Sequence, residues 1–415
     1  MPEKLTYIDL FAGAGGLSEG FVRAGYEPVA HVEYDRAACY TLKTRATFHF
    51  LHETGNLDIY YDYLKGKMSR EKLYSHVPEN ILNSVINAEI GKDNNEIFHS
   101  IDNLLGTESV DLIIGGPPCQ AYSVVGRAPL KHKKDDERTR LYIQYGRFLK
   151  KYSPKMFVFE NVPGILSAAD GQYYKNLQSY YKRLGYKVEA KLLNSYNYGV
   201  VQHRQRVIII GWKKELNFSY PDIPEINDKY YRDTIFSDLP PIKPGENKKT
   251  HKYYKETNDY LSKNAIRNGI DFISQHITRP HNERDLTIYK LAIKYLEQGE
   301  RLKNDQIPVE MRTQKNISDF LDRFKVVDRE PHTMIAHIAK DGHHFIHPDK
   351  KQLRSISVRE AARIQSFPDD YYFEGIKENQ PRTSAFRQIG NAVPPLMAEK
   401  IAEQINKMLD NARTK

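Results

Sequence analysis

The first half of the chain alternates short apolar runs with amphipathic segments, and this alternation constrains the fold more than any other feature. Apolar runs predict strands over residues 6–11 and 29–32, with a helix between them that stops at Gly25. Further strands are expected at 110–114, 156–159 and 207–210, and a second amphipathic helix precedes Gly185. Strands that alternate with helices predict an α/β fold, a doubly wound, Rossmann-like parallel sheet.

The α/β pattern fades after Trp212, and the organisation of the chain changes there. Residues 213–250 hold five prolines amid charged residues, which indicates a domain boundary, and a basic, less periodic stretch follows to about Lys325. A Ser-x-x-Glu capping box at Ser357 predicts a helix over 358–365. A final helix is expected from Pro394-Pro395, with an apolar face that must pack on another element. At 415 residues the chain is long enough for two domains.

Composition narrows the class of protein. Lysine and arginine (62) exceed aspartate and glutamate (53), which gives a net charge of +9 and favours a polyanionic partner. No stretch approaches a membrane span, and the first strand follows only a few polar residues, so we expect no signal peptide and a cytoplasmic location. The two cysteines form no CxxC pair and cannot supply a disulfide framework.

Two residues that could serve as a nucleophile and a proton donor, Cys119 and Glu160, follow predicted strands. Cys119 comes directly after the apolar run 110–114 and Gly-Gly-Pro-Pro, and Glu160 closes the run 156–159. Open α/β sheets carry their chemistry at the carboxyl ends of the strands, so both residues are expected at one edge. The apolar run before Glu160 favours partial burial, which suits a carboxyl group to proton donation. The alternatives are a small buried cysteine and a solvated glutamate.

A glycine-rich turn follows the first strand in the order Phe11-Ala12-Gly13-Ala14-Gly15-Gly16. Such a turn lets the backbone and the helix N-terminus approach a ligand closely. Ser18 stands where a dinucleotide fingerprint would require glycine, so a nucleoside is the expected ligand. Glu33 ends the second strand, where an acidic side chain can accept ribose hydroxyls. The alternative is a tight turn without a ligand.

Two further groups of polar residues require interpretation. Arg204 and Arg206 lead into the apolar run 207–210. Because side chains alternate between the two faces of a strand, the two arginines are predicted to share one face and to contact phosphate or carbonyl oxygens. The alternative is an ordinary charge pair. His343 and His347 have the spacing of helical metal ligands, but Pro348 argues against a helix there, so we expect no metal site.

The order of these motifs resembles that of the DNA (cytosine-5) methyltransferases, from Tyr7 to the final helix. The resemblance weakens between Asn56 and Ser109 and is slight from Pro244 to Lys325. The matching motifs are Phe11-x-Gly13-x-Gly15-Gly16, Pro118-Cys119-Gln120, Glu160-Asn161-Val162, Gln202-x-Arg204-x-Arg206, Arg359-Glu360-Ala361-Ala362-Arg363 and Gly390-Asn391-Ala392-Val393-Pro394.

The resemblance implies a Rossmann-like methyltransferase domain over residues 1–240, a smaller mixed target-recognition domain over 241–350, and a C-terminal segment, 351–415, that returns to the first domain and packs beside the first strand. It also implies that S-adenosylmethionine is the cofactor. Glu89-Ile90 is the nearest match to the family's adenine-binding step, although the usual Gly-Asp-Ile pattern is Ala-Glu-Ile here. The implied cofactor contacts are Phe11, Gly13, Gly15, Gly16, Leu17, Glu33, Tyr34, Glu89, Ile90, Pro117, Leu141, Asn391 and Val393.

The family chemistry assigns a role to each remaining motif. The implied nucleophile is Cys119, which would add to carbon 6 of a cytosine flipped out of duplex DNA. Glu160 would bind ring nitrogen 3 and the amino group, Arg206 the carbonyl oxygen, and Arg204 with Arg206 would lower the pKa of the thiol. The segment 121–127 resembles the mobile catalytic loop, and Lys131-His132-Lys133-Lys134 adds phosphate-binding charge, a solvated loop being the alternative.

The main hypothesis is a prokaryotic DNA methylase specific for a short duplex sequence, either solitary or paired with a restriction endonuclease that acts separately. Sequence reading would fall to residues 245–330. A monomer is sufficient, because each chain holds one site. A transfer RNA methyltransferase is an alternative, but its second characteristic cysteine, in a Cys-Phe-Thr step, is absent. An inactive DNA-binding regulator of the same fold is the other alternative.

Overall fold

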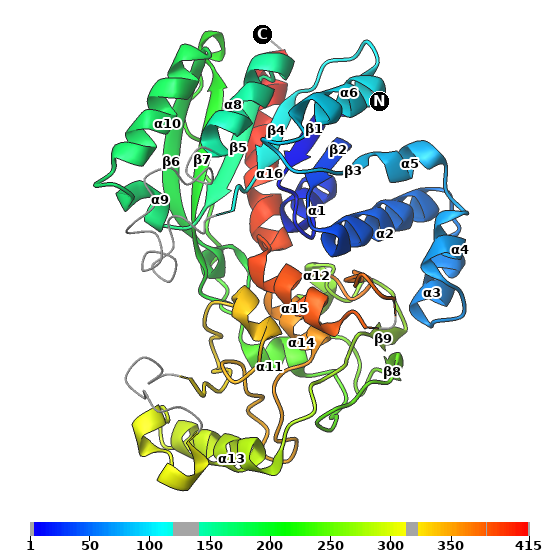
Figure 1. Ribbon diagram of the computed structural model, residues 1–415, viewed down its shortest axis with the longest axis vertical. Coiled ribbons are helices and arrows are strands. Elements are labelled where there is room, and N and C mark those ends of the chain that lie inside the picture. The colour runs from blue at the N-terminus through cyan, green and yellow to red at the C-terminus, as the bar shows by residue number, and fades with distance from the viewer. Residues whose placement is uncertain (1–3, 119–140, 313–322, 379, 414–415) are drawn as a thin grey trace.

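The computed structural model describes residues 4–118, 141–312, 323–378 and 380–413. A seven-stranded sheet in the order β3-β2-β1-β4-β5-β7-β6 forms the upper half of the molecule in Figure 1. All neighbouring strands are parallel except β7, which runs antiparallel to both β5 and β6. The strands are β1 (Thr6–Leu10), β2 (Glu27–Glu33), β3 (Val85–Asn87), β4 (Leu112–Gly115), β5 (Met156–Asn161), β6 (Tyr186–Asn194) and β7 (Gln205–Lys213).

Two hydrophobic layers cover the sheet, because successive side chains of each strand point to opposite faces. In β5, Phe157 and Phe159 join the core under α6 (Asn94–Leu105), α8 (Leu141–Tyr152) and α10 (Gln172–Arg183). Met156 and Val158 join the core under α1 (Gly16–Arg23) and α16 (Pro395–Arg413). This arrangement confirms the predicted doubly wound α/β fold.

The last helix, α16, lies over the sheet and packs mainly against α1. Gly20 of α1 lies so close to Ala398 of α16 that a side chain on Gly20 would overlap it, and Tyr26 Oη donates to the Ala402 carbonyl at 3.2 Å. The prediction placed α16 beside the first strand itself. The two helices meet through small residues, which explains their close approach.

Residues 36–83 form a group of helices at the side of the sheet in Figure 1: α2 (Arg36–Glu53), α3 (Leu57–Leu64), α4 (Arg70–Tyr74) and α5 (Glu79–Asn83). The weakly matching stretch therefore contributes helices and the short edge strand β3. Its apolar side chains share a separate core with Ile270 and Phe272. These helices thus connect the sheet to the lower half of the molecule.

The lower half contains little regular structure. Its elements are α11 (Arg232–Phe236), the antiparallel strands β8 (Thr250–Lys252) and β9 (Phe272–Ser274) with α12 (Asp259–Lys263) between them in sequence, and α13 (Glu283–Glu297), then α14 (Val358–Ile364) and α15 (Arg382–Asn391). Around α13 a small core of its own includes Tyr289, Phe324 and Ile346. The capping box predicted at Ser357 and Glu360 is present at the start of α14. In the described part of the chain, no helix combines the length and hydrophobicity needed to cross a membrane.

Candidate active site

The loop after β1 forms an open cradle at the carboxyl end of the central strands. Phe11, Gly13 and Gly15 all have positive φ angles (57°, 56° and 77°), and Gly15 caps the N-terminus of α1. A Cβ atom on Gly13 would meet no atom within 4 Å, whereas one on Gly16 would overlap the Val393 carbonyl. The cradle is therefore open above Gly13 and closed at Gly16 by the returning C-terminal segment.

Glu33 links this cradle to the loop after β2. Its carboxylate accepts hydrogen bonds from the backbone N–H groups of Gly13 and Asp35, each at 2.8 Å. Burial raises the pKa of Glu33, and these two hydrogen bonds oppose the rise. The next side chain, Tyr34, is 66% exposed, so an aromatic ring is available for stacking on a planar ligand.

Asp9 is a buried carboxyl group that sequence analysis did not single out. It lies on β1 and is 1% exposed, and its Oδ2 has no hydrogen-bond partner among the described residues. Burial and the nearby Glu33 raise the pKa of Asp9 well above its usual value. An aspartate within the apolar run Tyr-Ile-Asp-Leu-Phe was the available signal.

The remaining predicted cofactor contacts lie around the same strand ends. The N–H of Ala88, which follows β3, donates to the Glu33 carbonyl at 3.1 Å and brings the next two residues to this edge. Of these two, Glu89 is exposed and Ile90 is buried. Pro117 and Val393 are buried, Leu17 is buried on α1, Leu141 begins α8, and Asn391 is exposed at the end of α15.

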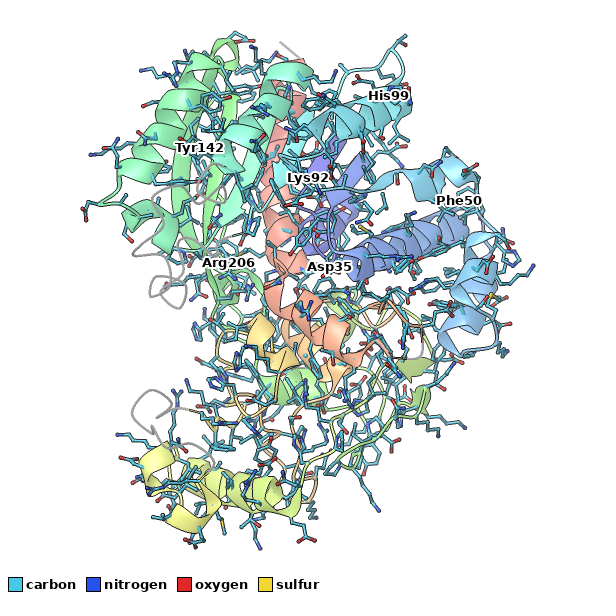
Figure 2. All side chains as sticks on the ribbon, in the orientation of Figure 1. Asp35, Phe50, Lys92, His99, Tyr142 and Arg206 are labelled. Atoms are coloured by element: carbon cyan, nitrogen blue, oxygen red, sulfur yellow. The ribbon has the colours of Figure 1, made fainter. Side chains whose placement is uncertain are left out.

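Glu160 and Arg206 form an ion pair between adjacent strands at the same edge. Arg206 Nε donates to Glu160 Oε1 at 2.7 Å, and each side chain is 12% exposed. A Cβ on Gly116 would lie 2.6 Å from Glu160 Oε2, so the absence of a side chain there leaves room for the carboxylate. Asn161 Nδ2 donates to the Pro117 carbonyl at 3.0 Å, which holds the Gly-Gly-Pro-Pro segment against β5. Figure 2 shows Arg206 and Asp35 at the sheet edge nearest the lower half of the molecule.

Arg204 does not share the face of Arg206, and the expectation of one common arginine face is wrong. β7 begins at Gln205, so strand alternation does not extend to Arg204. The Arg204 side chain is fully buried, and its guanidinium donates to the carbonyls of Met334 and Gly390. It therefore joins the start of β7 to the segments around Met334 and Gly390, whereas Arg206 pairs with Glu160.

Cys119 lies outside the described residues, as do the predicted catalytic loop and the basic run 131–134. The described chain leads to that position through Pro118, which is exposed directly after Pro117. The other cysteine, Cys39, is buried in α2, and burial raises the pKa of its thiol to about 12. Cys39 is therefore unsuited to act as a thiolate.

The histidine pair that has the spacing of metal ligands makes other contacts. The described segment around His343 and His347 forms no helix. His343 Nδ1 bonds to Tyr289 Oη at 2.8 Å, and His347 Nε2 lies 3.5 Å from a carboxylate oxygen of Glu360. Both histidines thus connect elements of the lower half.

The geometry defines a class of protein: an α/β fold with an open glycine-rich loop at the strand ends and an acid–arginine pair two strands away. A sequence profile described as C-5 cytosine-specific DNA methylase matches residues 5–65 and 77–407, so the chain belongs to that family and is a DNA (cytosine-5) methyltransferase.

Known proteins resemble the chain over nearly its full length. A type II methyltransferase of Bacillus paralicheniformis, M.Bpa9945I, is 40% identical, covering 98% of this chain and 99% of its own. M.DdeI, a type II methyltransferase of Desulfomicrobium norvegicum, is 32% identical over 98% of this chain and 90% of its own. A crystal structure from Escherichia coli, described as a prophage-encoded DNA modification methyltransferase, has the same fold with a TM-score of 0.67 at 23% identity, covering 98% and 100% of the two chains.

Proposed function

We propose that this enzyme methylates carbon 5 of a cytosine flipped out of duplex DNA, within a specific short sequence, through a covalent bond to Cys119. The observation that supports this proposal best is the Glu160–Arg206 pair. It lies beside the segment that leads to Cys119 and at the same sheet edge as the cradle of Gly13 and Glu33. The likeness to type II methyltransferases supports a place in a restriction-modification system, with any partner endonuclease acting separately.

The cradle fits S-adenosylmethionine as the methyl donor. The space above Gly13 is open, and Tyr34 presents an exposed ring for the adenine. We assign donor binding to the other predicted contacts as well. They are Phe11, Gly15, Gly16, Leu17, Glu33, Glu89, Ile90, Pro117, Leu141, Asn391 and Val393. When bound, the donor supplies an electrophilic methyl group to carbon 5 of the base.

The protein residues would activate the base and release it. Carbon 5 of cytosine is a weak nucleophile until the Cys119 thiolate adds to carbon 6 and forms a carbon–sulfur bond. Glu160, hydrogen-bonded to ring nitrogen 3 and the amino group, would stabilise the charge that this addition creates, and Arg206 would hold the carbonyl oxygen. After methylation, loss of the proton from carbon 5 breaks the carbon–sulfur bond and restores the thiolate. Because Arg204 is buried against backbone carbonyls, we assign it a structural role.

The target base must leave the duplex to reach this edge, at a cost of a few kcal/mol. We assign sequence reading to residues 245–330 within the proposed recognition domain, 241–350. Lys248, Lys249, Lys252 and Lys255 in that region suit phosphate contacts, which carry affinity and little specificity.

The test is transfer of labelled methyl from S-adenosylmethionine to mixed-sequence duplex DNA and, in parallel, to bulk transfer RNA, followed by base-resolution mapping of 5-methylcytosine. We expect label in DNA at one recurring short motif. The Cys119→Ser variant should bind donor and DNA but transfer no methyl, because a hydroxyl is a far weaker nucleophile than a thiolate. Label only in RNA, or Cys119→Ser turnover near that of the parent enzyme, would contradict the proposal.

A further inference from the structure

A histidine and a glutamate meet near the start of β7, outside the residues assigned to the chemistry. His203 Nε2 lies 2.9 Å from Glu330 Oε2, and the two side chains are 46% and 45% exposed. Tyr196 Oη donates to the other carboxylate oxygen at 3.0 Å, and its ring stacks on the His203 ring with centroids 4.3 Å apart. These hydrogen bonds lower the pKa of Glu330, so its carboxylate stays ionised at neutral pH.

The backbone reinforces this contact on the side of Glu330. The His203 N–H donates to the Pro331 carbonyl at 3.3 Å, and Thr333 Oγ1 donates to the His203 carbonyl at 2.6 Å. The Met334 N–H donates to Gln202 Oε1. Residues 330–334, which leave the proposed recognition region, are therefore held along residues 202–204.

On its other side the same turn is held by β6. Asn194, the last residue of β6, pairs its side-chain amide with His203 Nδ1 at 3.1 Å, and its Oδ1 accepts the Arg204 N–H at 3.1 Å. The turn leads directly into β7, where Arg206 lies opposite Leu193 in the strand register. Any displacement at His203 is thus transmitted through two covalent residues to Arg206 and its partner Glu160.

We propose that the His203–Glu330 pair is a positioning element for Arg206: it fixes the chain that leaves the recognition region against the start of β7, and so holds the Arg206–Glu160 pair in register for the reaction. This inference rests on the proposed function. Neither residue is assigned a contact with donor, base or reacting atoms. Because the pair is half exposed, the network of Tyr196, His203 and Glu330 matters more than the pair alone.

The test is a double-mutant cycle of His203→Ala, Glu330→Ala and the combined variant, with separate kcat and KM values for DNA and for S-adenosylmethionine. Each single change should lower kcat by about fivefold with both KM values unchanged, and the combined variant should be no worse than either. His203→Gln, which keeps a donor toward Glu330, should recover most of the loss. His99→Ala on α6, an exposed histidine remote from the sheet edge, is the matched control and should retain full kcat.

Thermal unfolding of every variant distinguishes positioning from stability. We expect midpoints within about 4 °C of the parent, since a half-exposed pair contributes little to stability. Multiplicative losses in the combined variant, an unchanged kcat, or losses confined to KM would overturn the positioning role while the parent enzyme still methylates DNA. Absence of methyl transfer by the parent enzyme would instead overturn the proposed function, and this inference with it.

Discussion

Two regions of this molecule use arginine–carboxylate pairs for different ends. At the junction of α11 and α14 in the lower half of the molecule, Arg363 bonds both Asp238 and Asp369, with all three side chains fully buried. At the sheet edge, Arg206 meets the single carboxylate of Glu160, and both remain partly exposed. Complete burial with two acids holds the fold, whereas a partly exposed pair stays accessible to a ligand.

The same division separates two arginines of one motif. Arg204 is buried with its guanidinium on the backbone carbonyls of Met334 and Gly390, and Arg206, two residues later, pairs with Glu160. We therefore expect Arg204 to contribute to the stability of the fold and Arg206 to contribute to turnover.

The largest effect is expected at the buried junction. Arg363→Met would remove the guanidinium that two buried aspartates share, leaving Asp238 with Arg267 and Asp369 with the more distant Arg359, and should lower the free energy of unfolding by about 3–5 kcal/mol. Urea denaturation measures this change. Lys151→Met, which breaks an exposed pair with Asp102, is the control and should cost about 1 kcal/mol or less. Equal losses in the free energy of unfolding for the two variants would mean that burial of the Arg363 pairs does not make them more stabilising than an exposed pair.

A change of the partly buried carboxylate of Glu160 should act mainly on turnover. Glu160→Gln keeps the shape and one acceptor for Arg206 but loses the acid, so kcat should fall by about 10²–10⁴-fold. The free energy of unfolding should change by about 1 kcal/mol or less, because the pair is partly exposed. Single-turnover methyl transfer and urea denaturation give the two values, and a kcat within tenfold of the parent would be contrary to this assignment.

A smaller effect on the same group is expected from its neighbour. The Cβ in Gly116→Ala would lie 2.6 Å from Glu160 Oε2 and would push the carboxylate away from its position. Because misplacement of a reacting group by about 1 Å can cost up to about 10²-fold, kcat should fall by about 10–100-fold. In the Glu160→Gln variant, Gly116→Ala should lower kcat little further. An additional loss of about 10–100-fold in kcat there would show that Gly116 does not act through Glu160.

The smallest effect concerns pH at the junction. Burial lowers the pKa of His347 to about 4, although the adjacent Glu360 opposes the shift. The unfolded chain, with a histidine pKa near 6.5, then binds more protons than the folded chain, so stability is present above pH 6.5 and is lost as the pH falls toward 4.

His347→Gln should therefore reduce the stability lost between pH 7 and pH 5 by about 1–2 kcal/mol. Urea midpoints at the two pH values measure the difference. Identical pH dependence in the parent and the variant would mean that His347 is not the titrating group.

The sequence could predict those parts of the fold that depend on buried apolar runs. The strands β1, β2, β4, β5 and β7 were all expected, because continuous apolar residues of strand length are diagnostic when both faces of a sheet are covered. The edge strand β6 was missed, because its charged residues Lys187, Glu189 and Lys191 alternate with apolar residues and leave no continuous apolar run. Strand β3 has only three residues, which is too short for a periodic signal.

The site was predictable in its residues and less so in their arrangement. Glu160 was expected at the carboxyl edge of the sheet, and the resemblance implied that Arg206 contacts the same base; the ion pair shows that the two side chains do lie together. Arg204 was misplaced because alternation was extended one residue beyond the strand, to a position fixed by contacts with residues 130 and 186 positions away in sequence. No local pattern encodes such contacts. The role of Cys119 stays a prediction.

The most direct test of this account compares Arg204→Lys with Arg206→Lys in one series, with kcat and the free energy of unfolding measured for each. Arg206→Lys should lose kcat by about 10²-fold and keep its stability, because lysine cannot reproduce the guanidinium geometry at the reacting base. Arg204→Lys should lose about 2–4 kcal/mol of stability and, where folded, keep kcat within about threefold. The reverse pattern, or equal losses of kcat in both variants, would contradict the division of roles on which the account rests.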